Sequence, residues 1–114
     1  MSHWKGRVFF SKVGAERTIA RKVSTSLLMI LQEAVGNAFQ HGHASSVTVE
    51  LEYGEKSLFM RVMNAGETFD VNKVEEKGHY GLAGMRTRAQ EIGGTLKIES
   101  GDEITEITVE VPYG

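Results

Sequence analysis

The sequence lacks cysteine, a strong net charge and any long apolar run. The absence of cysteine excludes a disulfide framework and a cysteine-ligated metal, and it fits a reducing compartment. The net charge of −2 argues against a nucleic-acid-binding surface, because such domains are usually clearly basic. No apolar run approaches the roughly 20 residues of a membrane-spanning helix, and early charged residues argue against a signal peptide. We therefore expect a soluble intracellular protein.

The chain of 114 residues is long enough for one domain with one core. Its 40% hydrophobic and 25% charged residues are ordinary for a globular protein. Neither an internal repeat, a low-complexity tract nor a linker divides it. We expect one domain over 1–114, with 1–6 as a tail.

Periodicity predicts an α+β fold. Clean alternation and short apolar runs predict strands over 7–13, 47–53, 57–63, 95–100 and 106–111. A helix is expected between a cap at Ser24, Thr25 or Ser26 and a stop at Gly42, and a second over 82–92, closed by Gly93. Residues 64–81 are expected to be a long loop, and such loops are usually functional or disordered. The economical arrangement is a two-layer sandwich, in which one antiparallel or mixed sheet carries its helices on one face.

The first helix carries an unusual polar row. Glu33, Asn37 and His41 recur every fourth residue along the shoulder of the apolar stripe, which consists of Leu27, Leu31, Ala34, Val35 and Ala38. Asparagine is a mediocre helix former, but its carbonyl oxygen is a neutral ligand for Mg²⁺, and a carboxylate one turn away can hold one of the waters of that ion. A solvated helix flank explains any one of these residues, but explains the three together less well.

Glycines at the start of the second helix suggest a phosphate site. Gly78, Gly81 and Gly84 are spaced by threes, and backbone amides at a helix N-terminus bind anions readily. A flexible loop with tight helix packing is the alternative explanation.

These motifs resemble those of the GHKL ATPase superfamily, which includes sensor histidine kinases and DNA gyrase. LQEAVGNAFQHGHASSVTVEL, from residue 31, is similar to its N box, most closely in histidine kinases partnered with NarL-type regulators, such as the nitrate sensors and DesK. The resemblance makes Glu33 and Asn37 the catalytic pair, in which Asn37 binds Mg²⁺ and Glu33 orients a water on it. It also places Gln40 and His41 at the ATP, although these kinases often have lysine at the position of Gln40.

NAGETF, residues 64–69, follows a predicted buried strand, where the family has its G1 box, Asp-x-Gly-x-Gly. Taken alone, the segment is a turn. The resemblance makes Asn64, Gly66 and Thr68 ATP-binding residues, with Asn64 in place of the aspartate that accepts a hydrogen bond from adenine. Asn64 keeps an acceptor but loses the charge, and charge-assisted hydrogen bonds are roughly twice as strong as neutral ones. The threonine also crowds a position where glycine allows close approach.

The stretch Gly81–Ala89, followed by a Gly-Gly pair, closely resembles the G2 box of NarL-type kinases. It implies that 67–80 form the ATP lid and that the nucleotide contacts His79, Gly81, Leu82, Gly84 and Met85. Arg86 and Arg88 are expected either to reach phosphates or a partner helix, or only to solvate their own helix.

The resemblance implies a domain that binds ATP and Mg²⁺ and positions the γ-phosphate for transfer to a histidine. The histidine-bearing helical domain is not recognisable in this sequence, so we expect no autophosphorylation by this chain alone. The other implied partner is a NarL-type response regulator, the location is cytoplasmic, and the isolated domain is expected to be monomeric.

Two alternatives stay open. Asn64, Thr68 and Gln40 together also fit a degenerate GHKL domain that acts as a non-catalytic interaction module. An anti-sigma-factor-type serine kinase shares the fold, but the Met-Arg-x-Arg-Ala run from Met85 favours the histidine kinase.

Overall fold

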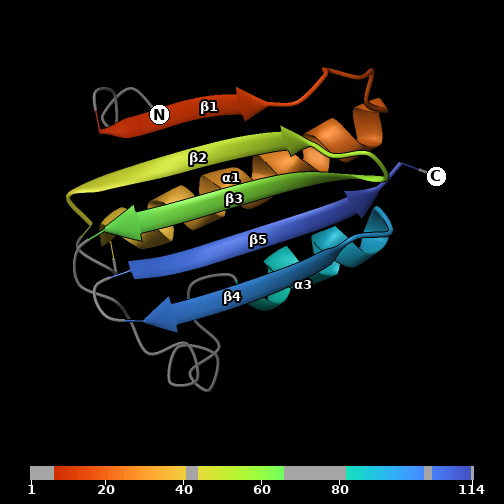
Figure 1. The fold of residues 1–114 in the computed structure, drawn as a ribbon. Coiled ribbons are helices and arrows are strands. Elements are labelled where there is room, and N and C mark those ends of the chain that lie inside the picture. The colour runs from red at the N-terminus through yellow and green to blue at the C-terminus, as the bar shows by residue number, and fades with distance from the viewer. Residues whose placement is uncertain (1–6, 41–43, 66–81, 102–103, 114) are drawn as a thin grey trace.

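The computed structural model describes residues 7–40, 44–65, 82–101 and 104–113. Their strands form one five-stranded sheet in the order β1-β2-β3-β5-β4, shown in Figure 1. Strand β1 runs parallel to β2, and the other neighbours are antiparallel. The sheet is therefore mixed, and its strands are β1 (Val8–Val13), β2 (Ser46–Tyr53), β3 (Ser57–Ala65), β4 (Thr95–Gly101) and β5 (Ile104–Pro112).

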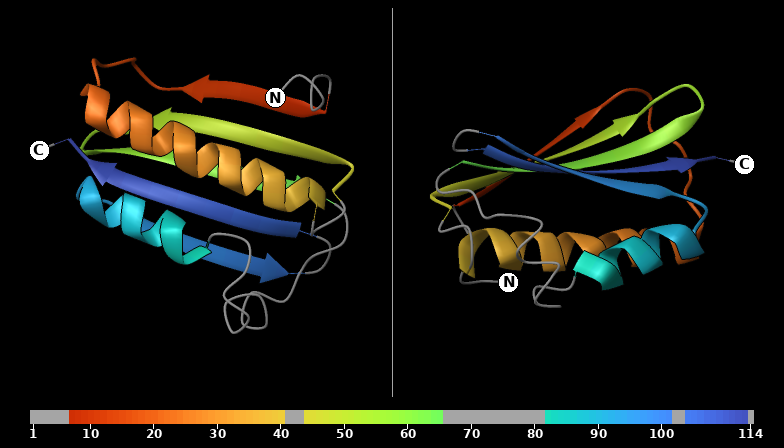
Figure 2. Two further views of the ribbon diagram at one scale, coloured as in Figure 1. Left: turned by 180° about the vertical axis from the view of Figure 1, so that it is seen from behind. Right: turned by 90° about the horizontal axis from the view of Figure 1, so that it is seen from below.

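Both described helices, α1 (Arg21–Gln40) and α3 (Leu82–Glu91), cover the same face of the sheet (Figure 2). The predicted α+β two-layer sandwich is thereby confirmed. The core lies between the layers, where the predicted stripe of α1 meets Val47, Val62 and Val109. Within the described residues, no helix combines the length and the apolar character that crossing a bilayer requires.

Helix α1 begins earlier than its sequence predicts. Its first residue is Arg21, and the carbonyl of Ala20 accepts hydrogen bonds from the amides of Val23 and Ser24 at 3.0 and 3.1 Å. The Ser24 hydroxyl also donates to this carbonyl at 3.3 Å. A serine can bond back one turn inside a helix instead of capping it, so the predicted cap at Ser24, Thr25 or Ser26 is wrong. The predicted stop at Gly42 lies outside the described residues.

Strand β3 ends later than predicted. The expected loop includes Asn64 and Ala65, but both residues belong to the strand. Asn64 pairs with Val47 of β2 and Thr105 of β5. Strand β5 is also longer than predicted, because it begins at Ile104 and not at Glu106. The reason is that ladder hydrogen bonds to two neighbouring strands outweigh the turn preference of Asn-Ala-Gly. The side chain of Asn64 is consequently held by a central strand and not by a turn.

Helix α3 ends at the predicted place. Gly93 has φ +75°, the left-handed conformation that glycine adopts without steric cost. The amide of Gly94 donates to the carbonyl of Ala89 at 2.8 Å, which satisfies the last turn and directs the chain into β4.

On the helix-free face of the sheet, Arg61 forms a small ion-pair cluster. Its Nη1 atom lies 2.9 Å from Glu50 and 2.7 Å from Glu52, and its guanidinium lies 5.2 Å from the centroid of the Phe59 ring. The hydrogen bond to Glu52 raises the pKa of Arg61. The arginine thus ties β3 to β2 across their exposed face.

We expect Arg61→Gln to lower the free energy of unfolding by about 1 kcal/mol, because two partly exposed ion pairs contribute up to roughly 1 kcal/mol each. Urea denaturation monitored by circular dichroism measures this loss. The control is Lys97→Gln on the same face, whose ion pair with Glu99 spans 3.6 Å between exposed side chains and should change stability by less than about 0.5 kcal/mol. Equal effects of the two variants would contradict the prediction.

Candidate functional site

Buried polar side chains gather at one end of the core. Among the described residues four polar side chains are buried, namely Asn37, Ser57, Asn64 and Thr105. All but Ser57 come from the end of the domain where α1 and β3 finish and β5 begins (Figure 1). We call Asn37, Asn64 and Thr105 the polar end of the core. Burying a polar group costs free energy unless it is hydrogen-bonded, so this end is chemically distinct from the rest of the core.

Two predicted site residues on α1 differ in exposure. Asn37 is only 5% exposed and lies beside Ala34 and Ala38, which belong to the core. Glu33, one turn earlier, is exposed. The two described residues of the predicted polar row therefore face different ways. The amide of Asn37 faces the core, whereas the carboxylate of Glu33 faces solvent.

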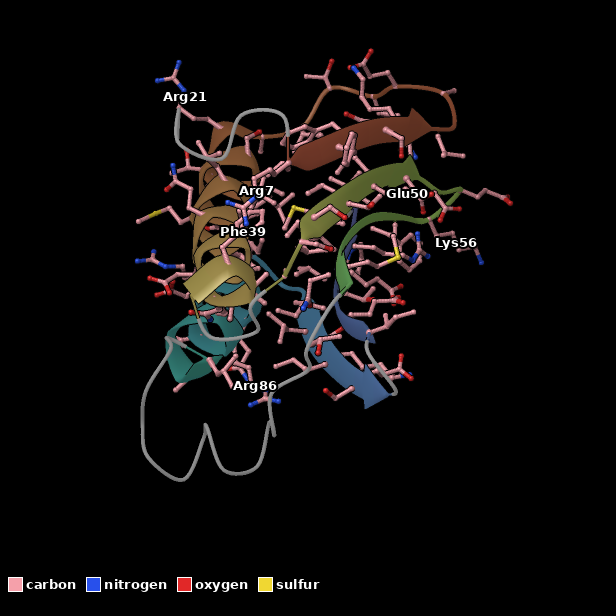
Figure 3. The ribbon with its side chains drawn as sticks, turned by 90° about the vertical axis from the view of Figure 1, so that its left-hand side faces the viewer. Arg7, Arg21, Phe39, Glu50, Lys56 and Arg86 are labelled. Atoms are coloured by element: carbon pink, nitrogen blue, oxygen red, sulfur yellow. The ribbon has the colours of Figure 1, made fainter. Side chains whose placement is uncertain are left out.

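The end of α1 is tied to the edge of the sheet. The guanidinium of Arg7 lies 4.2 Å from the centroid of the Phe39 ring, and its Nη2 atom donates to the carbonyl of Ala44 at 3.2 Å. Figure 3 shows Arg7 beside Phe39. The amide of Ala44 donates in turn to the carbonyl of Ala38 at 3.0 Å. These contacts position the last turns of α1, which carry Asn37.

A hollow of about 260 Å³ separates the two helices. This interhelical hollow is lined by side chains of α1 and of α3, namely Met29, Gln32, Glu33, Gly84, Met85 and Arg88. Glu33 comes from the segment similar to the N box, and Gly84 and Met85 come from the segment similar to the G2 box. All three line this hollow, although the two segments are far apart in the chain. Asn37 and Asn64 are not among its lining residues.

The three described site residues of α3 differ in their surroundings. Leu82 and Met85 are buried members of the hydrophobic core, whereas Gly84 is exposed, and a Cβ atom there would meet nothing within 4 Å. Packing among the described residues therefore does not require glycine at 84, although glycine inside a helix costs roughly 1 kcal/mol relative to alanine. Arg86 is partly buried beside this turn, and Figure 3 shows its position.

Asn64 has an unsatisfied amide. Its side chain follows Val62 on the helix-facing side of β3 and is 5% exposed. The Nδ2 atom is fully buried and has no hydrogen-bond partner among the described residues. Such groups are rare in native structures, and each needs an explanation. Asn64 also borders a shallow hollow of about 170 Å³ lined by residues of β2, β3 and β5.

Sequence reasoning missed Thr105, the most deeply buried member of the polar end of the core. Thr105 is 1% exposed, pairs with Asn64 in the β3–β5 ladder, and has its hydroxyl oxygen 3.2 Å from that of Ser100. Its signal was available, because Thr105 shares the alternation of Ile107, Val109 and Val111, which predicts an inward-facing side chain.

The remaining predicted site residues are not described by the structure. They are His41, Gly66, Thr68, His79 and Gly81, together with the side chain of Gln40. The expected lid over 67–80 also lies outside the described residues. In the described part of the chain, no group of three or more His, Cys, Asp or Glu side chains converges as a metal site would.

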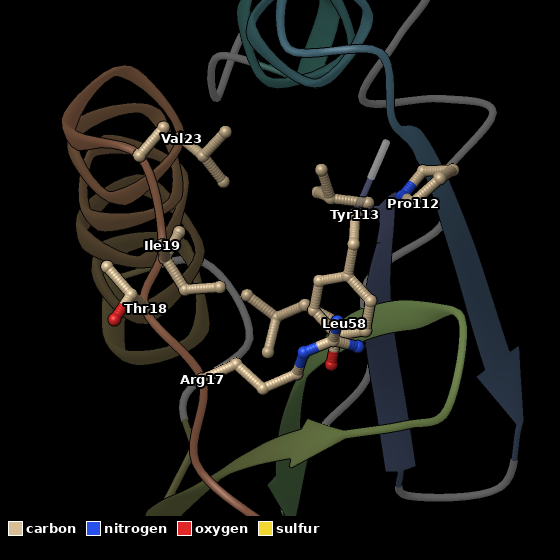
Figure 4. A pocket seen from close by; sticks show the side chains of 9 residues that line it. Arg17, Thr18, Ile19, Val23, Leu58, Pro112 and Tyr113 are labelled. Atoms are coloured by element: carbon tan, nitrogen blue, oxygen red, sulfur yellow. The ribbon is translucent and has the colours of Figure 1, made fainter.

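A second hollow, of about 220 Å³, lies at the opposite end of α1 (Figure 4). Ile19, Val23 and Leu58 contribute apolar side chains to it. Arg17 lies 3.8 Å from the centroid of the Tyr113 ring, and the Tyr113 hydroxyl donates to the carbonyl of Gly54 at 2.9 Å. None of the predicted site residues that the structure describes borders this hollow.

Comparison with known proteins identifies a matching family model, HATPase_c, described as histidine kinase-, DNA gyrase B- and HSP90-like ATPase, over residues 22–114. The chain is 38% identical over 98 residues to the sensor histidine kinase LiaS of Bacillus subtilis, covering 85% of this chain and 27% of LiaS. It is 39% identical over 99 residues to the sensor protein VraS of Staphylococcus saprophyticus, covering 85% of this chain and 28% of VraS. The chain thus spans about a quarter of the length of these relatives, and they do not confirm the narrower likeness to the nitrate sensors and DesK.

Solved structures show the same fold. The ATP-binding domain of PrrB from Mycobacterium tuberculosis matches with a TM-score of 0.76 at 20% identity, covering 99% of this chain and 85% of that domain. The nucleotide-free catalytic domain of the histidine kinase ThkA matches with a TM-score of 0.71 at 20% identity, covering 94% of this chain and 81% of that domain.

Proposed function

Because this chain belongs to the histidine kinase-, DNA gyrase B- and HSP90-like ATPase family, we propose that it binds Mg²⁺–ATP and presents the γ-phosphate to a histidine. That histidine lies on a separate helical domain of the same kinase, in two-component signalling. Since the chain spans 27% of LiaS, the activity of the complete protein is part of this proposal. The cytoplasmic location, where ATP is available, is also part of this proposal.

The interhelical hollow is the observation that carries the proposal. It joins the exposed carboxylate of Glu33 with the first turns of α3 at Gly84. Amides in the first turn of a helix lack partners within the helix and favour anions. Since packing among the described residues does not require glycine at 84, close approach of a phosphate explains its presence. We therefore assign the triphosphate to this side of α3.

Glu33 and Asn37 supply oxygen atoms of the kind that magnesium ions prefer. Mg²⁺ keeps several waters and is bound by one or two protein oxygens plus substrate phosphates, so it needs no cluster of acidic side chains. In our assignment the amide oxygen of Asn37 would be the direct ligand, and Glu33 would hold one of the waters. This assignment rests on the likeness of their motif to the N box, because Asn37 does not line the interhelical hollow. When bound, the ion offsets the negative charge of the phosphates.

The chemistry assigned to this domain is positioning. In the transfer, a nitrogen of the partner histidine forms a bond to the γ-phosphorus, and the bond from phosphorus to the bridging oxygen breaks, which releases ADP. Catalysis of phosphoryl transfer is almost entirely positioning plus electrostatic stabilisation. Glu33, Asn37 and the start of α3 thus supply geometry and charge, whereas the nucleophile comes from the partner domain.

We assign a NarL-type response regulator as the downstream partner. The support is the likeness of Gly81–Ala89 to the G2 box of the kinases that serve such regulators. The assignment of Gln40, His41, Gly66, Thr68, His79 and Gly81 to ATP, and of 67–80 to the lid, likewise rests on the likeness of their motifs. A non-catalytic interaction module is the second candidate function, because an amide stands at position 64 where the family carries an acid.

Calorimetric titration with a non-hydrolysable ATP analogue tests the proposal. We expect saturable binding in the micromolar to millimolar range that is stronger with Mg²⁺ than with EDTA, because the ion joins the phosphates to Asn37. Thermal unfolding at the same nucleotide concentrations should show stabilisation, since a ligand that binds only the folded state raises its stability. Neither heat nor stabilisation at millimolar nucleotide would reject ATP binding and favour the interaction module.

A further inference from the structure

The unsatisfied amide of Asn64 requires a partner from outside the described residues. Asn64 is only 5% exposed, and its Nδ2 atom has no acceptor among the described residues. Leaving a buried polar group unpaired is costly, and a structural asparagine would be expected to have a local partner. A ligand atom that accepts this hydrogen bond resolves the cost.

The base is the part of the nucleotide that suits this amide. Our proposed function assigns the triphosphate to the interhelical hollow, and Asn64 is not among the residues that line that hollow. The edge of a purine carries a hydrogen-bond donor beside an acceptor, which matches the donor and acceptor of one amide group. Ribose hydroxyls and phosphates do not present such a fixed pair.

Nothing described fixes which way the amide points. The backbone of Asn64 is held in a central strand, between Val47 and Thr105. The hydroxyl of its neighbour Thr105 lies within hydrogen-bond distance of Ser100. Because Nδ2 has no acceptor among the described residues, rotating the amide by half a turn breaks no described hydrogen bond at that atom. Asn64 is therefore able to present either its oxygen or its nitrogen to the ligand.

We infer that Asn64 makes this site accept purine nucleotides with either an amino or an oxo group at position 6, an inference that rests on the proposed function. A 6-amino group donates to the amide oxygen, and a 6-oxo group accepts from the amide nitrogen. An ionised carboxylate only accepts, so an aspartate at position 64 would favour the amino form and repel the oxo form. Residue 64 is thus a specificity-determining position.

Titration with ATP and with inosine triphosphate (ITP), which carries oxygen at position 6, tests this inference. For the unaltered chain we expect the Kd for ITP to lie within about tenfold of the Kd for ATP. For Asn64→Asp we expect the ratio of the two values to rise by roughly 10–100-fold, which corresponds to one buried group left unpaired. ATP itself should bind Asn64→Asp more tightly, because its hydrogen bond becomes charge-assisted.

Two further variants separate the possible outcomes. Asn64→Leu fills the same space without polar atoms and should weaken ATP and ITP about equally. Thr108→Val, on the opposite face of the sheet, should leave both constants unchanged. Circular dichroism checks that each variant folds, and Asn64→Leu still tests the inference if a buried carboxylate at 64 prevents folding.

The outcomes also distinguish this inference from the function on which it rests. Binding of ATP with ITP more than about 100-fold weaker in the unaltered chain would overturn the role of Asn64 while ATP binding stands. An equal loss of affinity for ATP and ITP in Asn64→Asp would also overturn the role of Asn64, while ATP binding by the unaltered chain stands. If neither nucleotide binds the unaltered chain, the proposed function itself fails.

Discussion

Asn37→Ala is expected to abolish the dependence of ATP binding on Mg²⁺ and to weaken binding in Mg²⁺ by at least about tenfold. Even outer partners of a metal ligand typically contribute 10–100-fold to metal affinity, and in our proposal Asn37 is the direct protein ligand. With EDTA present, the unaltered chain and the variant should bind the nucleotide about equally. Calorimetric titration of both proteins under the two conditions measures the difference.

The buried position of Asn37 determines the controls. Its side chain is 5% exposed, so the alanine variant is also expected to lose some stability, which thermal unfolding without nucleotide reports. Asn37→Asp keeps an oxygen ligand and should retain the Mg²⁺ dependence. Thr25→Ala, at an exposed position of α1 that does not line the interhelical hollow, checks for general effects on the helix. A Mg²⁺ dependence that survives in Asn37→Ala would remove the assigned metal role.

The second large effect is expected in the core, where Ile30→Ala should lower the free energy of unfolding by about 3–4 kcal/mol. Ile30 is 0% exposed, and truncating a buried isoleucine loses transfer free energy and leaves a cavity, which together cost 2–5 kcal/mol. Chemical denaturation with a fitted m-value measures the loss.

Leu28 provides the matched control on the same helix. It is 52% exposed, so Leu28→Ala should change the free energy of unfolding by less than about 0.5 kcal/mol. Comparable losses in the two variants would mean that α1 packs by a different face from the one described.

The fold was largely predictable because local patterns agree with burial. The alternation in 47–53 correctly predicts that Val47 and Val49 face the core while Thr48 faces away. The stripe on α1 is likewise buried, although its sequence description omitted Ile30, which lies at the centre of the same face. The pairing of β1 was not predictable, because its parallel partner lies beyond an entire helix and no turn sets the register.

Candidate site residues could be predicted from the sequence only where residues of one kind recur at regular spacing, as the polar residues of the first helix and the glycines before the second do. Glycine spacing and the polar row identified Glu33 and Gly84, which the interhelical hollow brings together. The same reasoning placed Asn64 in a turn, because Asn-Ala-Gly favours turns locally and pairing with two strands is a non-local effect. Thr105 was missed because the predicted strand began at Glu106, whereas β5 begins at Ile104, so the alternation was not followed back to it.

Strand β1 leads to a separate consequence for how the molecule opens. Among the described strands it pairs only with β2, and apart from the partly buried Val8 its residues are exposed. Val8 packs against the core cluster, but no residue of β1 is one of its buried members, so we expect β1 to detach while β2 to β5 and both helices stay packed. Local stability follows such differences in burial. We therefore expect the backbone amides of β1 to exchange with solvent through a partial opening, and not through the cooperative unfolding of the domain.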